Sequence, residues 1–341
     1  MTVESDEEFK LWGLASARQG FLRRRWVWIS LCKLEKQRRG GDLVHKSISR
    51  AVNADSPVIM LQGDNLKHLS SLADSSIDLV VTSPPYNIGK DYEKVMPTED
   101  YLRLQRAVIS ECVRVLKPTG SICWQVGFTK SGNEIVPLDI LLYPIFKEFG
   151  LKLKNRIVWT FGHGMHAQKR FSGRHETILW FVKDLDKAIF DLESVRVPQK
   201  YPGKRHYRGP KKGEYSGHPA GKNPGDVWEI PNVKAHHVEK TDHQCQFPIG
   251  LVQRLIRGLS PLGGTVLDPY SGVATTASAA ILEERKSVSI ELFPEYFKIG
   301  LTRASAALSG TLQYRPIEKP IQEPSPSNPA TWRDSDASGD A

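Results

Sequence analysis

Hydrophobic and polar positions along the chain form short apolar runs that alternate with stretches of helical spacing. The runs bounded by polar residues predict buried strands at 58–61, 77–82, 120–126, 155–161, 176–182, 265–268 and 287–291. Apolar residues three and four positions apart predict helices at 65–72, 99–116, 137–149, 248–259 and 275–283. Because strands and helices alternate, the pattern predicts an α/β fold built on one sheet.

Three parts of the chain lack this alternation. Residues 1–54 are basic and irregular, and we expect a DNA-facing arm, a poorly ordered leader or sequence upstream of the true start codon. Residues 196–235 begin with a non-periodic stretch rich in Pro, Gly, Lys, Arg and Tyr, which predicts an inserted surface segment. Residues 316–341 are rich in Pro, Ser and Asp, and a disordered tail is expected. The remaining residues, 55–195 and 236–315, then form the two halves of one domain.

Composition narrows the function only slightly. Lys and Arg number 47 against 38 Asp and Glu in 341 residues, and this net charge of +9 favours nucleic acid or simply a basic surface. The four cysteines show no paired spacing, so neither a disulfide framework nor a zinc site is predicted. The longest apolar run near the start, 26–32, is too short to cross a bilayer, and no cleavable export signal follows it. We therefore expect a cytoplasmic protein without a membrane segment.

The segment 268–276 has the sequence Asp-Pro-Tyr-Ser-Gly-Val-Ala-Thr-Thr and joins a predicted strand to a predicted helix. Ligands bind at the carboxyl ends of strands in such sheets, and small residues in the turn let the backbone approach a cofactor. Glu291 ends the next strand, where a carboxylate can accept hydrogen bonds from ribose hydroxyls. An ordinary strand-to-helix turn is the alternative, but the terminal acid favours a nucleoside-binding unit.

A second motif, Ser83-Pro84-Pro85-Tyr86, follows the predicted strand 77–82. Two successive prolines fix an extended backbone and remove its N–H donors, so that carbonyl oxygens remain as rigid polar groups. Such a loop suits an amine: the Ser83 side chain and the Pro84 carbonyl can each accept one of its hydrogens, and Tyr86 can stack on a base. A rigid turn or a proline-rich ligand sequence is the alternative, and the position after a buried strand argues against the ligand.

The two motifs together resemble those of the DNA amino-methyltransferases, whose signatures are Asp/Asn/Ser-Pro-Pro-Tyr/Phe/Trp and Asp-Pro-Phe-x-Gly-x-Gly-Thr-Thr. The catalytic loop precedes the cofactor turn and a basic insertion separates them, as in the group labelled beta. The resemblance covers about residues 57–305. It implies a Rossmann-like S-adenosylmethionine-dependent methyltransferase sheet with an inserted target-recognition region, typical of bacterial restriction–modification enzymes.

The resemblance also implies individual roles. Its catalytic residues are Ser83, Pro84, Pro85 and Tyr86. Its cofactor-binding residues are Asp64, Phe247, Asp268, Pro269, Tyr270, Gly272, Thr275 and Glu291. Two positions depart from the family pattern: Gln244 replaces a common Pro, and Ala274 replaces the second glycine of the cofactor turn. Alanine disfavours a positive φ, so this departure predicts weaker cofactor binding if the turn requires one.

The acceptor base is less strongly indicated. In the family, serine at the first loop position accompanies cytosine-N4 methylation more often, and aspartate accompanies adenine-N6. Because a hydroxyl can accept a hydrogen bond from either amine, Ser83 favours cytosine and leaves adenine as the alternative. Methylation of the cytosine ring carbon requires a nucleophilic cysteine, usually in a Pro-Cys loop, and the chain has no Pro-Cys dipeptide. Methyl transfer by direct displacement needs no metal, and none is predicted.

The stretch from Lys200 to Lys222 holds seven Lys or Arg and one acid, with three tyrosines interleaved, which suits phosphate and base-edge contacts. The predicted DNA-binding residues are Lys204, Arg205, Arg208, Lys211, Lys212, Arg170 and Arg174. The partners implied are double-stranded DNA and a cognate restriction endonuclease, with the enzyme a monomer or homodimer near the nucleoid. The rival classes are an RNA- or protein-directed methyltransferase, which usually has the opposite motif order, and a non-catalytic DNA-binding relative.

Overall fold

The computed structural model describes residues 48–90, 92–162, 164, 166–201 and 203–321. Most of the predicted N-terminal extension, residues 1–47, and most of the predicted tail, residues 322–341, lie outside the described residues. The fold below is that of the compact unit that begins at Ser47.

Nine of the described strands form one sheet in the order β1-β2-β11-β10-β3-β4-β8-β7-β9. Neighbours from β1 to β4 run parallel, whereas β8 is antiparallel to both β4 and β7. The strands are β1 Ile48–Ser49, β2 Val58–Gln62, β3 Ile77–Thr82, β4 Leu116–Val126, β7 Lys152–Thr160, β8 His175–Val182, β9 Val227–Glu229, β10 Thr265–Asp268 and β11 Lys286–Glu291. The predicted α/β class is therefore confirmed.

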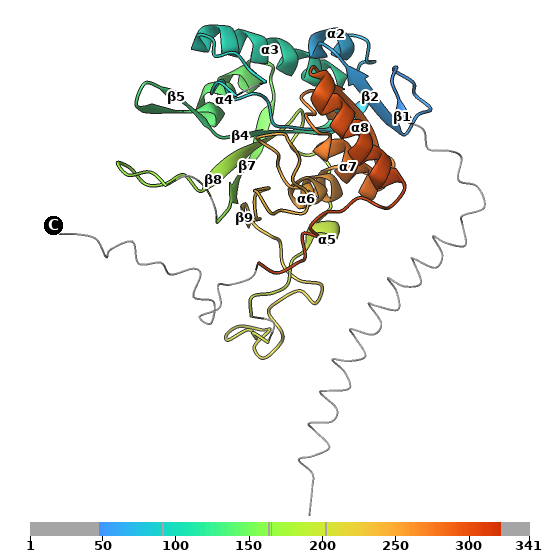
Figure 1. Ribbon diagram of the computed structural model, residues 1–341. Helices are drawn as coiled ribbons and strands as arrows, with labels where there is room; N and C mark the ends of the chain where they lie inside the picture. Colours follow the sequence, from blue (N-terminus) through green and yellow to red (C-terminus); the bar gives the residue numbers. More distant parts are fainter. Residues whose placement is uncertain (1–47, 91, 163, 165, 202, 322–341) are drawn as a thin grey trace, which may run out of the picture. The chain divides into compact units, whose positions relative to one another are not determined.

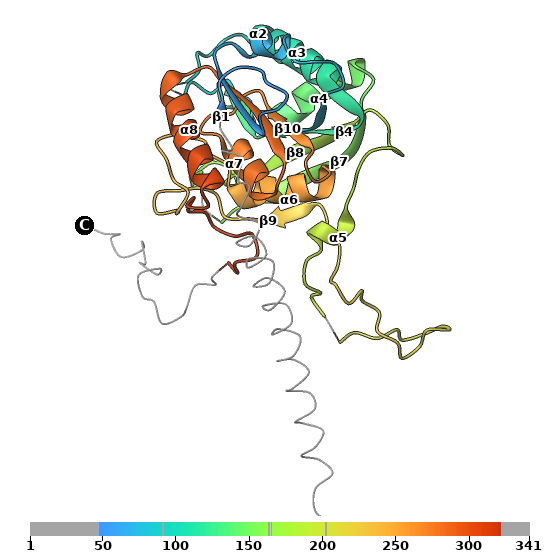
Figure 2. The same ribbon diagram turned by 90° about the vertical axis from the view of Figure 1, so that its right-hand side faces the viewer.

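Helices cover both faces of this sheet (Figures 1 and 2). One layer contains α2 Asn65–Leu69, α3 Thr98–Val115 and α4 Leu138–Glu148. The other contains α6 Ile249–Leu259, α7 Thr275–Leu282 and α8 Pro294–Leu308. Successive residues of β3 face opposite layers: Val80 belongs to the cluster under α3, and Leu79 and Val81 belong to the cluster under α6. Both faces of the strand are apolar because both are covered.

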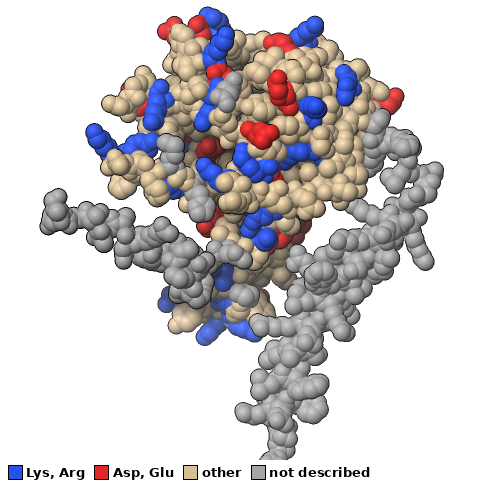
Figure 3. All heavy atoms as spheres, viewed as in Figure 1, with Lys and Arg blue, Asp and Glu red and all other residues tan. Residues whose placement is uncertain are grey.

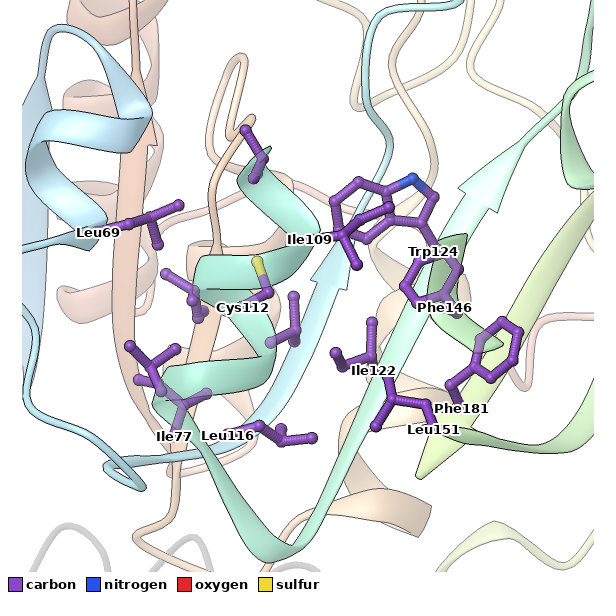
Figure 4. Packing of buried hydrophobic residues seen from close by; sticks show 14 of the residues in the cluster. Leu69, Ile77, Ile109, Cys112, Leu116, Ile122, Trp124, Phe146, Leu151 and Phe181 are labelled. Atoms are coloured by element: carbon purple, nitrogen blue, oxygen red, sulfur yellow. The ribbon is translucent and has the colours of Figure 1, made fainter. Parts of the chain in front are cut away.

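Three fully buried aromatic side chains lie together beneath α3 and α4 (Figure 4). The Trp124 ring meets the edge of Phe146 at 5.6 Å between centroids, and Phe146 stacks on Phe181 at 4.5 Å. Ile109 and Cys112 of α3 are fully buried in the same cluster. The centre of the sheet is thus rigidly packed, which fixes the strand ends above it.

The hydrophobic pattern of the sequence did not predict several elements of the structure. These are β1, β9, α8, the one-turn helix α5 Leu192–Val195, and the hairpin of β5 Phe128–Ser131 with β6 Glu134–Pro137. The strand β1 falls inside the segment 1–54 and pairs with β2, so regular structure begins before Pro57. Residues 316–321 of the predicted tail also have defined positions: Ile317 packs against the cluster under α6, and Glu318 lies 2.9 Å from the guanidinium of Arg257.

Candidate active site

Four adjacent parallel strands end at one edge of the sheet, and each end carries a side chain predicted for the site. Ser83 follows β3, Asp268 ends β10, Glu291 ends β11, and Asp64 lies two residues after β2. The order β2-β11-β10-β3 places these ends next to one another, although the residues are far apart in sequence. This edge is where open α/β sheets bind ligands.

A pocket opens at this edge, and most of the predicted site residues line it. Those lining residues are Asp64, Ser83, Pro84, Pro85, Tyr86, Phe247, Pro269, Tyr270, Gly272, Thr275 and Glu291. Asp268 is the exception among the predicted catalytic and cofactor-binding residues, because its buried carboxylate lies beneath the pocket wall and accepts hydrogen bonds from Thr82 and from the Tyr270 N–H. Tyr92, Cys245, Phe293 and Tyr296 also line the pocket and were not predicted.

The turn between β10 and α7 has a positive φ at Ala274, the position where the family pattern has glycine. Ala274 has φ +58° and ψ +43°, so an alanine occupies the left-handed region at a cost of about 1 kcal/mol. The buried guanidinium of Arg303 in α8 donates to the Val273 carbonyl at 2.6 Å and to the Thr275 hydroxyl at 3.0 Å. These bonds and the packing around Ala274 hold the turn in place despite the missing glycine.

Glu291 connects this turn to the next strand. One carboxylate oxygen accepts the Gly272 N–H at 2.7 Å, and the other accepts the Phe293 N–H at 2.9 Å. Burial raises the pKa of Glu291 to about 7, against the lowering effect of these backbone bonds, and nearby Asp268 adds to the rise. Burial likewise raises the pKa of Asp268 to about 6. Each oxygen of Glu291 retains a second lone pair for a ligand hydroxyl.

The rings of Tyr92, His243 and Tyr296 pack together over the turn between β10 and α7. The His243 ring stacks on Tyr92 at 5.2 Å between centroids and meets the edge of Tyr296 at 4.6 Å. A β-carbon at position 272 would lie 3.2 Å from the His243 ring, so the glycine allows this close cover. Burial lowers the pKa of His243 to about 4, helped by Lys240 and Arg303, so the ring is neutral at pH 7.

The loop from Ser83 to Tyr86 is held on both sides. The Tyr101 hydroxyl of α3 donates to the Pro85 carbonyl at 3.0 Å. The Tyr86 hydroxyl lies 3.3 Å from the Ser83 hydroxyl and donates to the Glu176 carboxylate at 3.2 Å. Sequence reasoning missed Glu176, because a single glutamate near the start of an apolar strand belongs to no motif.

The predicted DNA-binding residues are not among those that line this pocket. Arg170 and Arg174 belong to the loop between β7 and β8, and the others lie in the segment that projects beyond α5 (Figures 1 and 2). On that segment Arg205 lies over the Tyr215 ring at 4.2 Å from its centroid. The space-filling view shows basic side chains gathered there (Figure 3). Arg170 lies 5.6 Å from the centroid of the Phe128 ring, and the adjacent Phe171 is fully exposed.

Taken together, the sheet and its strand-end pocket define the nucleoside-binding architecture of an S-adenosylmethionine-dependent methyltransferase. The sequence model of the DNA methylase family, which covers N6 and N4 methyltransferases, matches residues 77–302. The chain therefore belongs to this family. It is a DNA amino-methyltransferase that uses S-adenosylmethionine, and this confirms the resemblance and disfavours the RNA- and protein-directed alternatives.

Among its relatives, the chain is 49% identical over 238 residues to the type II methyltransferase M.BglII of Bacillus subtilis, an alignment that covers 70% of this chain and 66% of M.BglII. It is 37% identical to the type II methyltransferase M.ScaI of Streptomyces caespitosus, with 77% and 86% covered. It is also 34% identical to the DNA adenine methyltransferase YhdJ of Escherichia coli, with 73% and 83% covered. The similarities to the two type II methyltransferases support an amino-methyltransferase of the restriction–modification type.

Solved structures agree on the fold. The cytosine-N4-specific PvuII DNA methyltransferase superposes with a TM-score of 0.58 at 20% identity, over 76% of this chain and 95% of that one. TTHA0409 of Thermus thermophilus, solved in complex with S-adenosyl-L-methionine, superposes with a TM-score of 0.52 at 25% identity, over 74% of this chain and 96% of that one. Within the described residues, no helix is both long and apolar enough to span a membrane.

Proposed function

We propose that the protein methylates the N4 amine of cytosine within a specific double-stranded DNA sequence. The observation that carries the choice of base is Ser83, a neutral hydroxyl at the first position of the catalytic loop and in the wall of the pocket. Adenine-N6 is the second candidate, because the relative YhdJ, at 34% identity, is a DNA adenine methyltransferase.

The residues of the pocket fit the cofactor. The aromatic surfaces of Phe247 and Phe293 suit an adenine ring, and the Asp64 and Glu291 carboxylates suit an amine and ribose hydroxyls. Pro269, Tyr270, Gly272 and Thr275 line the rest of the pocket and would contact the methionine end. Asp268 acts from beneath, through Thr82 and the Tyr270 N–H. When bound, the cofactor supplies an electrophilic methyl group on a sulfonium.

The catalytic loop would receive the base after it leaves the duplex, since the amine cannot reach the pocket while it is stacked. The Ser83 hydroxyl and the Pro84 carbonyl accept the two amine hydrogens, which draws the nitrogen lone pair out of conjugation and towards the methyl group. The Tyr86 ring stacks on the base and holds its plane.

DNA binding is assigned to the basic residues outside the pocket. Lys204, Arg205, Arg208, Lys211 and Lys212 of the insertion, residues 196–235, would contact the target sequence and its phosphates, together with Arg170 and Arg174. The segments 55–195 and 236–315 then form the catalytic and cofactor-binding halves. The proposal also includes a cognate restriction endonuclease that recognises the same DNA sequence, and a methyltransferase that acts as a monomer or a homodimer.

Labelled S-adenosylmethionine and unmethylated bacterial genomic DNA test the choice of base. Digestion to nucleosides after the reaction should yield labelled N4-methylcytosine, and labelled N6-methyladenine would overturn the assignment. The Ser83→Ala variant should lose incorporation while still binding the cofactor, whereas undiminished incorporation would remove Ser83 from the catalytic loop.

A further inference from the structure

A chain of three hydrogen-bonding side chains runs from the pocket into the protein. The Ser83 and Tyr86 hydroxyls are 3.3 Å apart, and Tyr86 donates to Glu176 Oε2 at 3.2 Å. Ser83 and Tyr86 line the pocket, but Glu176 does not. Glu176 therefore touches the reaction only through Tyr86.

Counting hydrogens fixes the direction of this chain. A tyrosine hydroxyl has one hydrogen, and while Glu176 is ionised Tyr86 gives this hydrogen to the carboxylate. The bond between Ser83 and Tyr86 must then use the hydrogen of Ser83, with the Tyr86 oxygen as acceptor. The remaining lone pairs of Ser83 Oγ are left for the base amine, so the carboxylate makes Ser83 an acceptor towards the pocket.

The fold holds Glu176 at this point. It lies in β8, next to β4, and Gln125 of β4 donates its amide hydrogen to the same Oε2. A β-carbon at Gly127 would lie 3.2 Å from the Tyr86 ring and 3.4 Å from Cγ of Glu176. A side chain at position 127 would therefore crowd the Tyr86 ring by a few tenths of an ångström and would be in ordinary contact with Glu176.

We infer that Glu176 is a positioning residue for methyl transfer, which orients the Ser83 hydroxyl through Tyr86 and takes up the proton that the base amine loses. This inference rests on the proposed role of the catalytic loop. It applies to a cytosine or an adenine amine alike.

The proposed step balances in atoms and charge. The amine nitrogen forms a bond to the methyl carbon while the carbon–sulfur bond breaks, and the electrons of that bond stay on sulfur. The nitrogen, now positive, gives a proton to Ser83 Oγ; Ser83 passes its hydrogen to Tyr86, and Tyr86 passes its hydrogen to Glu176. Glu176 ends as a neutral carboxylic acid and releases the proton to solvent before the next turnover.

The surroundings of Glu176 suit a proton acceptor. Burial raises its pKa, and the hydrogen bonds from Tyr86 and Gln125 and the charge of Lys234 oppose this rise. Burial and the Glu176 carboxylate raise the pKa of Tyr86, with Cys245 a further contributor, so Tyr86 keeps its hydrogen at neutral pH. The rate should fall as the pH drops through the pKa of Glu176.

The test measures single-turnover methyl incorporation into genomic DNA at saturating cofactor, counted in total without regard to the base. Glu176→Gln should slow the chemical step on the order of 100-fold, the low end for acid–base contributions, and abolish the acidic limb of the rate profile. Tyr86→Phe, which keeps the ring, should cause a similar loss. The double variant should be no slower than Tyr86→Phe alone. Glu134→Gln, at an exposed position of the β5–β6 hairpin, is the matched control and should retain the wild-type rate.

Two results would overturn the inference: a wild-type rate for Glu176→Gln, or losses that multiply in the double variant. Measurements of cofactor binding and thermal unfolding identify a variant that has merely lost its fold. If Glu176→Gln is such a variant, the Tyr86→Phe variant provides the test, because its rate profile should also lack the acidic limb. Nucleoside analysis of the same samples reports the base separately, so an error in the cytosine assignment leaves this test intact.

Discussion

The Thr82 hydroxyl donates a hydrogen bond of 2.6 Å to the buried carboxylate of Asp268. Thr82 is the last residue of β3 and Asp268 the last of β10, so the bond joins the strand before the Ser83–Tyr86 loop to the strand before the turn that leads into α7. The same carboxylate oxygen also accepts the Tyr270 N–H at 3.1 Å. One buried acid therefore sets the relative positions of the two motifs.

Replacing Thr82 by valine should lower the free energy of unfolding by about 1–3 kcal/mol, because a buried carboxylate loses a hydrogen-bond donor. Thr82→Ser keeps the hydroxyl and should retain most of the stability. Urea unfolding followed by circular dichroism measures both.

The same pair predicts a dependence on pH. The pKa of Asp268 is about 6 in the folded chain against an ordinary value of 3.8, so the folded state binds more protons between these values. The contribution of Asp268 to stability is therefore lost as the pH rises from about 4 to about 6. Thr82→Val should lose more stability at pH 7 than at pH 4, and an equal loss at both would contradict the role of the ionised carboxylate.

The effects of substitutions at Ala274 and Gly300 on stability should depend on each other, because the two residues are in close contact. A β-carbon at position 300 would lie 3.1 Å from both the Ala274 β-carbon and the Met60 methyl, so Gly300→Ala should destabilise the protein by about 1–3 kcal/mol. Ala274→Gly relieves the left-handed strain but loses a buried methyl, so the two effects should cancel to within about 1 kcal/mol. The double variant should recover most of the loss in thermal unfolding, and additive losses would show that Ala274 is not the obstacle.

Cofactor affinity should depend on the ionisation of Glu291. With a pKa of about 7, the carboxylate is mostly ionised at pH 8 and mostly protonated at pH 6. If only the ionised form accepts both ribose hydroxyls, the dissociation constant of the cofactor should rise about 10-fold when the pH is lowered from 8 to 6. Isothermal titration calorimetry measures this; Glu291→Gln should bind more weakly at every pH with a flat profile. A flat wild-type profile would remove Glu291 from the ribose site.

The basic insertion should contribute to affinity through phosphates. If Lys211 and Lys212 each contact one phosphate, changing both to Gln should reduce the slope of log affinity against log salt by roughly 2. Lys286→Gln with Lys298→Gln removes the same charge from exposed positions on other elements and is the control. Fluorescence anisotropy with labelled duplex DNA measures the slopes, and equal changes in the two variants would mean that only net charge matters.

Much of the site follows from local patterns. The limits of β3 and β10 agree with the prediction to the residue, because each is a short apolar run with polar residues on both sides. The helix α8 was missed because small residues such as Gly300 and Ala304 face the core, and such residues leave a weak amphipathic pattern. The edge strands β1 and β9 are too short to show any period.

The sequence by itself determined the central strands that carry the pocket, the two motifs at their ends and, through the order of the motifs, the family. These properties depend on neighbouring residues, and parallel strands necessarily bring their carboxyl ends to one edge. Only the tertiary structure decided that Asp268 supports the pocket from below, that His243 covers the turn, and that Glu176 contacts Tyr86. Each of these contacts joins residues far apart in the chain, and their meeting depends on strand order, register and side-chain direction, which no local pattern encodes.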